Sequence, residues 1–432
     1  MNILIKNGRL IDPKSQIDAV HDIAIAGQRI VAIDPNPDEF KADRTIDASG
    51  LAVIPGLVDL SVRLREPGYE HRDTLETELM AALSGGVTRL VLPPDTDPTL
   101  DEPALVEMLK HRARALNQTY VYPLGAMTEA LEGEQLTEMS ELTRAGCIAF
   151  SHANRPLPAL STLKQCMQYA QSFGYSLWLR PHERSLTGNG VAASGEVASR
   201  LGLSGIPVQS ETIALHALFE LQRSVGVRLH LCRISSAQGV ELVRQAKAEG
   251  LPVTCDVSVN HVHLTDVDIG FFDSNYRLDP PLRGKRDRDA IIQGLLDGTI
   301  DAICSDHMPL DDEDKLVPFA EAQPGASGVE LLFSLVYKWA KDNSIPLLDA
   351  LTKVTSGPVS ILQQAAPAFS SCGQLSVGSP ADLALVDLEE YWTVNRDSLL
   401  SQSVHTPFIN YQVPGRVKLT IVSGRVMWEK AE

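Results

Sequence analysis

Eight short apolar runs alternate with helical patterns through the middle of the chain. The runs cover residues 57–60, 88–92, 120–124, 147–150, 176–179, 228–233, 252–257 and 302–304. Patterns typical of amphipathic helices lie between most of them, for example at 104–116, 211–224 and 237–248. Short buried strands separated by helices predict a parallel sheet, and eight such units favour a (β/α)8 barrel. A doubly wound open sheet is the alternative that this pattern leaves open.

The two ends of the chain consist of short β-forming runs joined by turns. Such runs lie at 3–5, 22–26 and 29–33, and again at 381–386 and 417–422. Asn7-Gly8 predicts a hairpin turn, and Ser423-Gly424 leads from one run into the next. We therefore predict an α/β protein with a small β-sandwich domain built from residues 1–53 and 366–432 and a barrel from residues 54–365. Residues 185–208, rich in Gly and Ser, are expected to form a long loop above the barrel.

Composition and charge narrow the classes of partner. The chain has 432 residues, 44% of them hydrophobic, and a formal net charge of −17, which argues against binding nucleic acid or an anionic membrane surface. No apolar run approaches the roughly 18 residues of a membrane-spanning helix, and the N-terminus shows no secretory pattern. The six cysteines form no C-x-x-C pair, and Cys147, Cys232, Cys255 and Cys304 fall in predicted buried strands. We therefore expect reduced cysteines and a cytoplasmic protein.

The residues at the carboxyl ends of the strands decide the chemistry of a barrel of this kind. The first run continues as Ser-Val-Arg-Leu-Arg at 61–65 before Glu-Pro-Gly ends it. This stretch resembles the first barrel strand of type I dihydroorotases, in the cyclic amidohydrolase superfamily. In that family the strand ends in His-x-His and both histidines bind zinc, whereas Ser61 and Arg63 stand here. A hydroxyl is a poor zinc ligand, and a guanidinium cannot deprotonate to become one.

Three later strand ends extend the resemblance, which covers essentially the whole chain. Ser-Asp-His-Met-Pro at 305–309 resembles the family's Thr-Asp-His-Ala-Pro, which implies that Asp306 is a vestigial metal ligand and general base and that His307 is a substrate contact. His-Leu-Cys-Arg at 230–233 resembles His-x-x-His, and Arg233 stands where the second histidine binds zinc. His182 is one residue out of register with another family ligand, and one residue along a strand turns a side chain to the opposite face.

Further positions differ from the family in charge. The resemblance implies that Arg65 binds the substrate carboxylate, and the alternative is an arginine that braces the rim. Asp95 and Asp279 stand where the family has substrate-contacting asparagines, so each would repel a carboxylate ligand unless it is paired. His152 and the His-Val-His segment at 261–263 are weaker metal candidates.

Among the positions that hold metal ligands in the family, only Asp306 clearly keeps a ligating residue, and His182 is a doubtful second. Two ligands are too few, because a tightly held zinc has three or four. We therefore expect no metal and no other cofactor. Without a metal to lower the pKa of water from 15.7 towards about 7, hydrolysis of a cyclic amide lacks a nucleophile near neutral pH. Arg63 and Arg233 are predicted to replace the charge of the metal and to hold Asp306 in a buried ion pair.

The first interpretation is a catalytically inactive dihydroorotase homologue. The chain resembles the inactive dihydroorotase-like chains found beside aspartate transcarbamoylase in some bacteria. This resemblance implies a structural role in the assembly of aspartate transcarbamoylase, in de novo pyrimidine biosynthesis. The implied partner is the transcarbamoylase catalytic chain, in a cytoplasmic hetero-oligomer.

Two other interpretations stay open. One is a hydrolase of another cyclic amide that uses a single metal. Its ligands would be His182, Asp306 and one of His152, His230 or His261. The other is a non-catalytic module that binds a small anion through Arg65 and His307.

Overall fold

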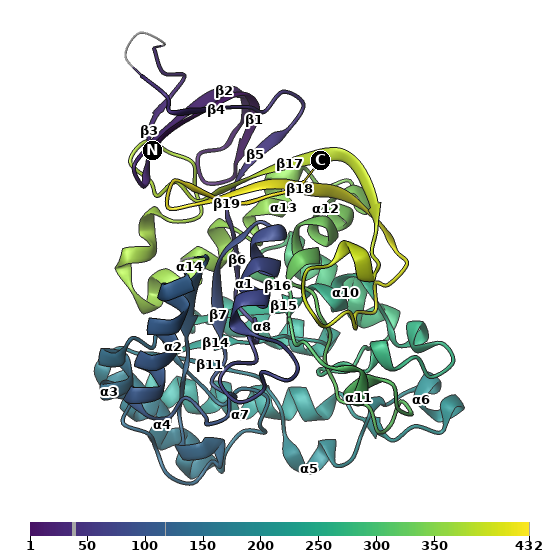
Figure 1. Cartoon of the computed structure of the whole chain (residues 1–432). Helices are drawn as coiled ribbons and strands as arrows, with labels where there is room; N and C mark the ends of the chain where they lie inside the picture. The colour runs from purple at the N-terminus through teal and green to yellow at the C-terminus, as the bar shows by residue number, and fades with distance from the viewer. Residues whose placement is uncertain (37–39, 117, 432) are drawn as a thin grey trace.

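The computed structural model describes residues 1–36, 40–116 and 118–431. Figure 1 shows two parts, a layer of strands that contains both termini and a barrel of strands and helices below it. No helix among the described residues is long and apolar enough to cross a bilayer.

The barrel is built from parallel strands whose bounds agree with the predicted apolar runs to within a few residues. They are β6 (Leu57–Asp59), β7 (Val87–Leu92), β8 (Tyr120–Pro123), β9 (Gly125–Ala126), β10 (Phe150–Ser151), β11 (Ser176–Leu179), β14 (Arg228–Leu231), β15 (Val253–Ser258) and β16 (Ala302–Cys304). Pairing runs β6-β7-β8 and β9-β10-β11-β14-β15-β16. β8 and β9 are consecutive pieces of one barrel strand, because only Leu124 separates them and its backbone N–H donates to Leu92.

The last and first strands meet, which distinguishes a closed barrel from an open sheet. His307, beyond β16, forms a parallel bridge with Val62, beyond β6. The buried Asp59 carboxylate accepts backbone hydrogen bonds from Ser61 and from Ser305, 3.2 and 3.1 Å long, and so ties the same two strands together. The predicted (β/α)8 barrel is therefore confirmed, and its carboxyl-end residues surround one mouth.

Helices cover the outside of the barrel. The longer ones are α1 (Leu75–Ser84), α2 (Pro103–Leu116), α3 (Met139–Ala145), α4 (Leu160–Phe173), α7 (Gln209–Val225), α8 (Ala237–Ala248), α10 (Lys285–Leu296), α12 (Leu332–Asp342), α13 (Leu347–Thr352) and α14 (Ser356–Ala365). The apolar faces predicted at 104–116, 211–224 and 237–248 correspond to α2, α7 and α8. α8 begins where the Ser236 hydroxyl accepts from the Gly239 backbone N–H and caps the helix.

Short elements form the loops around the mouth. They are η1 (Glu129–Leu131), α5 (Arg184–Thr187), β12 (Ala192–Ala193), α6 (Glu196–Leu201), β13 (Gly205–Ile206), α9 (Val259–His263), η2 (Asp266–Ile269), η3 (Ser274–Tyr276), α11 (Asp312–Lys315), η4 (Val329–Leu331) and η6 (Arg396–Ser398). A further short element, η5 (Pro367–Ser371), lies at the opposite end of the barrel. The prediction of a plain loop at 185–208 is wrong, because α5, α6 and a two-stranded parallel sheet of β12 and β13 occupy it. Cys255 and Cys304 lie in buried strands as predicted, whereas Cys147 and Cys232 lie just outside strands.

Strands from both ends of the chain form one sheet. They are β1 (Asn2–Asp12), β2 (Ile17–Ala26), β3 (Arg29–Ile33), β4 (Arg44–Asp47), β5 (Ala52–Pro55), β17 (Leu383–Thr393), β18 (Gln412–Val422) and β19 (Arg425–Glu429). The order is β19-β18-β17-β5-β1-β2-β3, with β4 added beside β1. The antiparallel pairing of β5 with β17 joins the two ends, and the β18–β19 hairpin turns at Ser423-Gly424.

The hairpin predicted at Asn7-Gly8 is wrong. β1 continues through both residues, and its register against β2 shifts between Ile5 and Gly8, which marks a bulge. Asn7 has a φ of 61°, a conformation that asparagine tolerates better than most residues. A side chain on Gly8 would place its Cβ 2.5 Å from Val53, so the pair of residues serves the bulge and the packing of β1 on β5.

Candidate functional site

Charged side chains from most of the barrel strands meet at the mouth. Arg63 and Arg65 follow β6, Asp95 follows β7, Arg180 follows β11, Arg233 follows β14 and Asp306 follows β16, while Asp279 comes from the loop after η3. All four arginines are buried, at 3% to 7% exposure. Burying a charged side chain is costly unless it is paired with an opposite charge. The partner of each arginine and aspartate therefore decides which of these groups could contact a metal or a substrate.

The predicted ion pair at Asp306 is confirmed. The Arg233 Nη1 donates to Asp306 Oδ1 over 2.8 Å, and the Arg63 Nη1 lies 3.9 Å from the same oxygen. Arg233 also donates through Nη2 to the Asn154 side-chain oxygen. The backbones of Arg233 and Asp306 both have positive φ, 57° and 54°, a conformation uncommon for side chains of this kind. Two guanidinium groups therefore lie against the carboxylate that resembles the family's metal ligand.

Asp95 and Asp279 are paired with two further guanidinium groups. The Arg63 Nε donates to Asp95 Oδ2 over 2.9 Å, and Arg180 makes a bidentate contact with Asp279. Burial would raise the pKa of both carboxyls, but the nearby guanidinium charges outweigh it, so the pKa of Asp95 falls and that of Asp279 falls to about 2. Each aspartate is therefore ionised at neutral pH and neutralised by an arginine.

Arg65 lies beside this network and turns its side chain to the protein backbone. Its Nε donates to the Pro309 carbonyl over 2.8 Å, and its guanidinium lies 5.7 Å from the centre of the Tyr69 ring. Burial and the nearby Arg63 lower the pKa of Arg65 to about 10. The cavity lined by Arg63, Arg65, Tyr69 and Asp95 has a volume of about 10 Å³, which is room for about one water molecule.

His307 is used inside the protein. Its ring is fully buried, Nε2 contacts the Glu78 carboxylate, and Nδ1 accepts from the backbone N–H groups of Gly328 and Val329. Burial lowers the pKa of His307 to about 3 and raises the pKa of Glu78 well above its usual range. Because Nδ1 accepts, the neutral ring carries its proton on Nε2 and donates it to the Glu78 carboxyl. No ring nitrogen of His307 is left for a small anion, in contrast to the role that the resemblance implies.

The other candidate histidines have separate partners and do not converge on Asp306. His182 Nε2 lies 2.7 Å from the Thr187 hydroxyl, and burial together with Arg180 lowers the pKa of His182 to about 4. The remaining contacts are His152 with Thr128, His261 with the Pro281 carbonyl and His263 with the Leu335 carbonyl. The set of His182, Asp306 and a third histidine is therefore not assembled.

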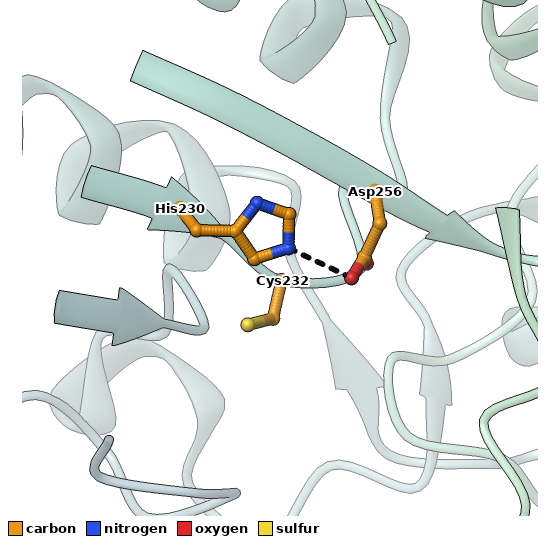
Figure 2. A group of neighbouring side chains, drawn as sticks. All are labelled: His230, Cys232 and Asp256. Carbon is orange, nitrogen blue, oxygen red and sulfur yellow. Dashed lines mark hydrogen bonds and ion pairs between the residues drawn. The ribbon is translucent and has the colours of Figure 1, made fainter. Parts of the chain in front are cut away.

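One group of metal-ligating side chains does lie close together, below the mouth. His230 of β14, Cys232 and Asp256 of β15 have potential ligand atoms within 4.8 Å of one another (Figure 2). His230 Nε2 lies 3.0 Å from Asp256 Oδ2, and its Nδ1 lies 2.9 Å from the Thr254 hydroxyl. Burial raises the pKa of the Cys232 thiol well above its usual range, so the thiolate that a metal needs is disfavoured. Hydrogen bonds within the protein already account for both imidazole nitrogens.

The residues at the mouth do not fit the zinc centre of a hydrolase. Among the described residues, the group of His230, Cys232 and Asp256 is the one set of three such side chains close enough to share an ion, and it includes neither Asp306 nor His182. Guanidinium groups cannot ligate a cation, and those of Arg63 and Arg233 lie beside Asp306. A dication beside Asp306 would meet the positive charges of Arg63 and Arg233 at short range.

Two contacts were not anticipated from the sequence. The Arg180–Asp279 pair joins residues 99 positions apart, and no local pattern marks Arg180 as the partner of Asp279. Glu78 lies on α1, in an ordinary amphipathic helical pattern, and it is fully buried beside His307. A charged residue on the apolar side of a helix is the signal that could have identified it.

Comparison with known proteins identifies close relatives of the whole chain. The family model "Dihydro-orotase-like" matches residues 50–239 and the model "Amidohydrolase family" matches residues 209–427. A dihydroorotase-like protein of Pseudomonas aeruginosa is 41% identical over 99% of this chain and 100% of its own length. A dihydroorotase of Thermoanaerobacter sp. is 37% identical over 100% of this chain and 98% of its own length.

The fold is also found in solved structures. The L-hydantoinase (dihydropyrimidinase) of Arthrobacter aurescens superposes with a TM-score of 0.88 at 24% identity, covering 100% of this chain and 96% of the hydantoinase. A D-hydantoinase of Thermus sp. gives a TM-score of 0.81 at 22% identity, covering 100% and 97%. At this identity the likeness shows a shared fold, a (β/α)8 barrel with an added β domain.

Proposed function

We propose that this chain, which belongs to the dihydroorotase-like family of amidohydrolases, is a non-catalytic member that serves as a structural subunit of aspartate transcarbamoylase. The observation that carries the first part is the set of arginine–aspartate pairs at the barrel mouth. Arg63 and Arg233 flank Asp306, and the adjoining cavity has a volume of about 10 Å³.

The loss of catalysis follows from the chemistry of these groups. Hydrolysis of a cyclic amide at neutral pH needs a water molecule activated by a metal and a base positioned beside it. Here Asp306 Oδ1 accepts a hydrogen bond from the Arg233 guanidinium, which occupies an oxygen that would have to take a proton. The cavity beside Arg63, Arg65 and Asp95 has room for about one water molecule, so a cyclic substrate would not fit in it.

The partner is assigned by the resemblance to inactive dihydroorotase-like chains that accompany aspartate transcarbamoylase. One surface feature supports an assembly role. Phe271 and Phe272, between η2 and η3, are 92% and 39% exposed, and Leu316, after α11, is 73% exposed. The two loops are joined by the Ser274 hydroxyl, which donates to the Lys315 carbonyl. Exposed apolar side chains that gather on one rim are typical of protein–protein contacts.

Metal analysis tests the non-catalytic part. Protein purified without chelator from zinc-supplemented cells is expected to hold less than about 0.1 zinc per chain, because a tight site needs three or four ligands. It is also expected to leave dihydroorotate unhydrolysed when zinc or manganese is added. One tightly held metal per chain together with hydrolysis would refute the proposal.

Co-expression tests the partner. The chain and an aspartate transcarbamoylase catalytic chain from the same organism are expected to elute together in size-exclusion chromatography, at a mass larger than either alone. Phe271→Ser should weaken the complex, whereas the matched control Leu160→Ser, at a 57% exposed position on α4, should not. Separate elution of the two unmodified chains would exclude this partner.

A hydrolase with a single metal remains the second candidate. Relatives that carry the name dihydroorotase are 34% to 37% identical along nearly the full chain, so the family itself favours enzymatic activity. Metal content and turnover of dihydroorotate separate the two candidates in the same experiment. Calorimetry with dihydroorotate and carbamoyl-aspartate tests the small-anion module, for which Arg65 would have to leave its contact with Pro309.

A further inference from the structure

A large cavity lies at the opposite end of the barrel from the mouth. It has a volume of about 570 Å³, within the range of roughly 300–1,000 Å³ typical of small-molecule sites. Its walls come from α2, the start of β8, the segment before β10, η5 and the β18–β19 turn. Parallel strands begin at this end, so the cavity is separate from the residues that resemble the active site of the family. It lies where the barrel meets the sheet of the two chain ends.

The charged groups of this cavity are all positive. Lys110 and Arg114 of α2 and Arg425 of β19 line it, and no aspartate or glutamate among the described residues does. This contrasts with a chain whose net charge is −17. Among the described residues, neither the Arg114 nor the Arg425 side chain has a hydrogen-bond or ion-pair partner, whereas Lys110 donates to the Ala145 carbonyl over 3.1 Å. Free guanidinium groups on two walls provide donors for an anion with several oxygens.

Lys110 is held in place by the shape of the backbone below it. A Cβ on Gly146 would lie 1.6 Å from the Lys110 Nζ, so the ammonium can lie over this position only because the residue is glycine. Burial, and then the like charge of Arg114, lower the pKa of Lys110. An anion between the two side chains would relieve that repulsion.

Aromatic rings form another part of the wall. Tyr122 and Phe369 meet edge to face with ring centres 4.8 Å apart, and Tyr120 lies nearly parallel to Tyr122, at 12°. The Gln118 side-chain oxygen is a buried acceptor with no hydrogen-bond partner among the described residues. Aromatic faces favour a planar ring, and a free amide oxygen can accept from a ring N–H or an amino group.

We propose that this cavity binds a small planar anion of the nucleoside monophosphate class, with the phosphate at Lys110, Arg114 and Arg425 and the base against the tyrosines. The proposal does not depend on the state of the barrel mouth. A phosphate monoester suits the three cations because it carries more than one negative charge at pH 7.

Isothermal titration calorimetry of the full chain tests the proposal with six probes: AMP, UMP, adenosine, uridine, ribose 5-phosphate and inorganic phosphate. We expect at least one nucleotide to bind about tenfold or more tightly than its nucleoside and than ribose 5-phosphate or inorganic phosphate, because the site uses both the base and the charge. Equal affinity for nucleotide and phosphate would overturn the assignment of the ring. Equal affinity for nucleotide and nucleoside would overturn the assignment of the anion.

Variants place the binding in this cavity. Arg114→Ala and Arg425→Ala are each expected to weaken nucleotide binding about tenfold or more, since each removes charge-assisted hydrogen bonds. Arg200→Ala, an exposed helical arginine outside the cavity, is the matched control and should leave the affinity unchanged. No binding of any probe, or binding that the two cavity variants leave intact, would refute the proposal.

Discussion

Replacing Arg233 by methionine tests whether charge pairing holds the barrel mouth together. The guanidinium lies 2.8 Å from Asp306 Oδ1 and is 4% exposed, so it neutralises a carboxylate that water barely reaches. Removing one partner of a buried ion pair costs about 3–5 kcal/mol, because the remaining charge is left uncompensated. Arg63 stays 3.9 Å from the same oxygen and compensates in part, so we expect the lower end of that range, about 3 kcal/mol.

Urea unfolding at pH 7.5 measures this change, with the free energy of unfolding taken from the midpoint and slope of each curve. The double variant Arg233→Met/Asp306→Leu is expected to lose less stability than Arg233→Met alone, because it leaves no unpaired carboxylate at this point. Arg200→Met, at an exposed helical position, controls for the change of residue type. A decrease of less than about 1 kcal/mol in the free energy of unfolding of Arg233→Met would refute the reasoning. It would also be refuted if the decrease for the double variant equalled the sum of the decreases for Arg233→Met and Asp306→Leu alone.

Three further perturbations test other parts of the molecule. Burial lowers the pKa of Lys315 to about 7 from 10.5, so the unfolded chain binds an extra proton between these values and the free energy of unfolding should rise with pH across that window. The rise is at most about 4–5 kcal/mol, and Lys315→Met should remove it from urea midpoints measured at pH 7 to 10. Gly424→Ala should cost more than the roughly 1–2 kcal/mol of a positive φ alone, because its Cβ would lie 2.0 Å from the Gly27 carbonyl oxygen. A Cβ on Gly27 would meet no atom within 4 Å, so Gly27→Ala should lose only the stability that its positive φ costs. Equal melting temperatures for the Gly424→Ala and Gly27→Ala variants would contradict the predicted clash at Gly424. Asp279→Asn leaves Arg180 buried without a counter-charge and should cost about 3 kcal/mol. Because the pKa of Asp279 is about 2, its carboxylate stays ionised between pH 8 and pH 5, and the difference in urea midpoint between this variant and the unmodified protein should be constant there. A difference that changes with pH in this range would contradict the pairing of an ionised Asp279 with Arg180.

The barrel and the central charge pairs could be predicted because their signals are local or positional. Alternating apolar runs and helical patterns repeat along the chain whatever lies around them, and α8 begins and ends at the residues expected from its sequence. The proximity of Arg63, Arg233 and Asp306 could be predicted from their positions in the sequence, because the carboxyl ends of barrel strands share one mouth.

Other features needed the tertiary structure. The Asn-Gly pair at residues 7–8 has the composition of a hairpin turn, yet the pairing of β1 with its neighbours makes it a bulge. His307 stands at the right position for a substrate contact, but Glu78 and the backbone of η4 take both ring nitrogens. In both cases the local pattern permits two outcomes, and the neighbouring strand or helix selects one of them.

The sequence by itself determined the architecture of the protein and the residue types at its barrel mouth, with Ser61, Arg63 and Arg233 where the family resembled has histidines. Periodic burial specifies strands and helices, and residue type alone excludes a guanidinium as a metal ligand. The tertiary structure decided which charges neutralise one another and where a cluster of cations lines a cavity. Arg180 meets Asp279 across 99 residues, and α2 and the β18–β19 hairpin, more than 300 residues apart in the sequence, line one cavity. Such contacts depend on how distant segments of the chain pack together. The interaction energy of two charges depends on the distance between them, and no local sequence pattern specifies that distance.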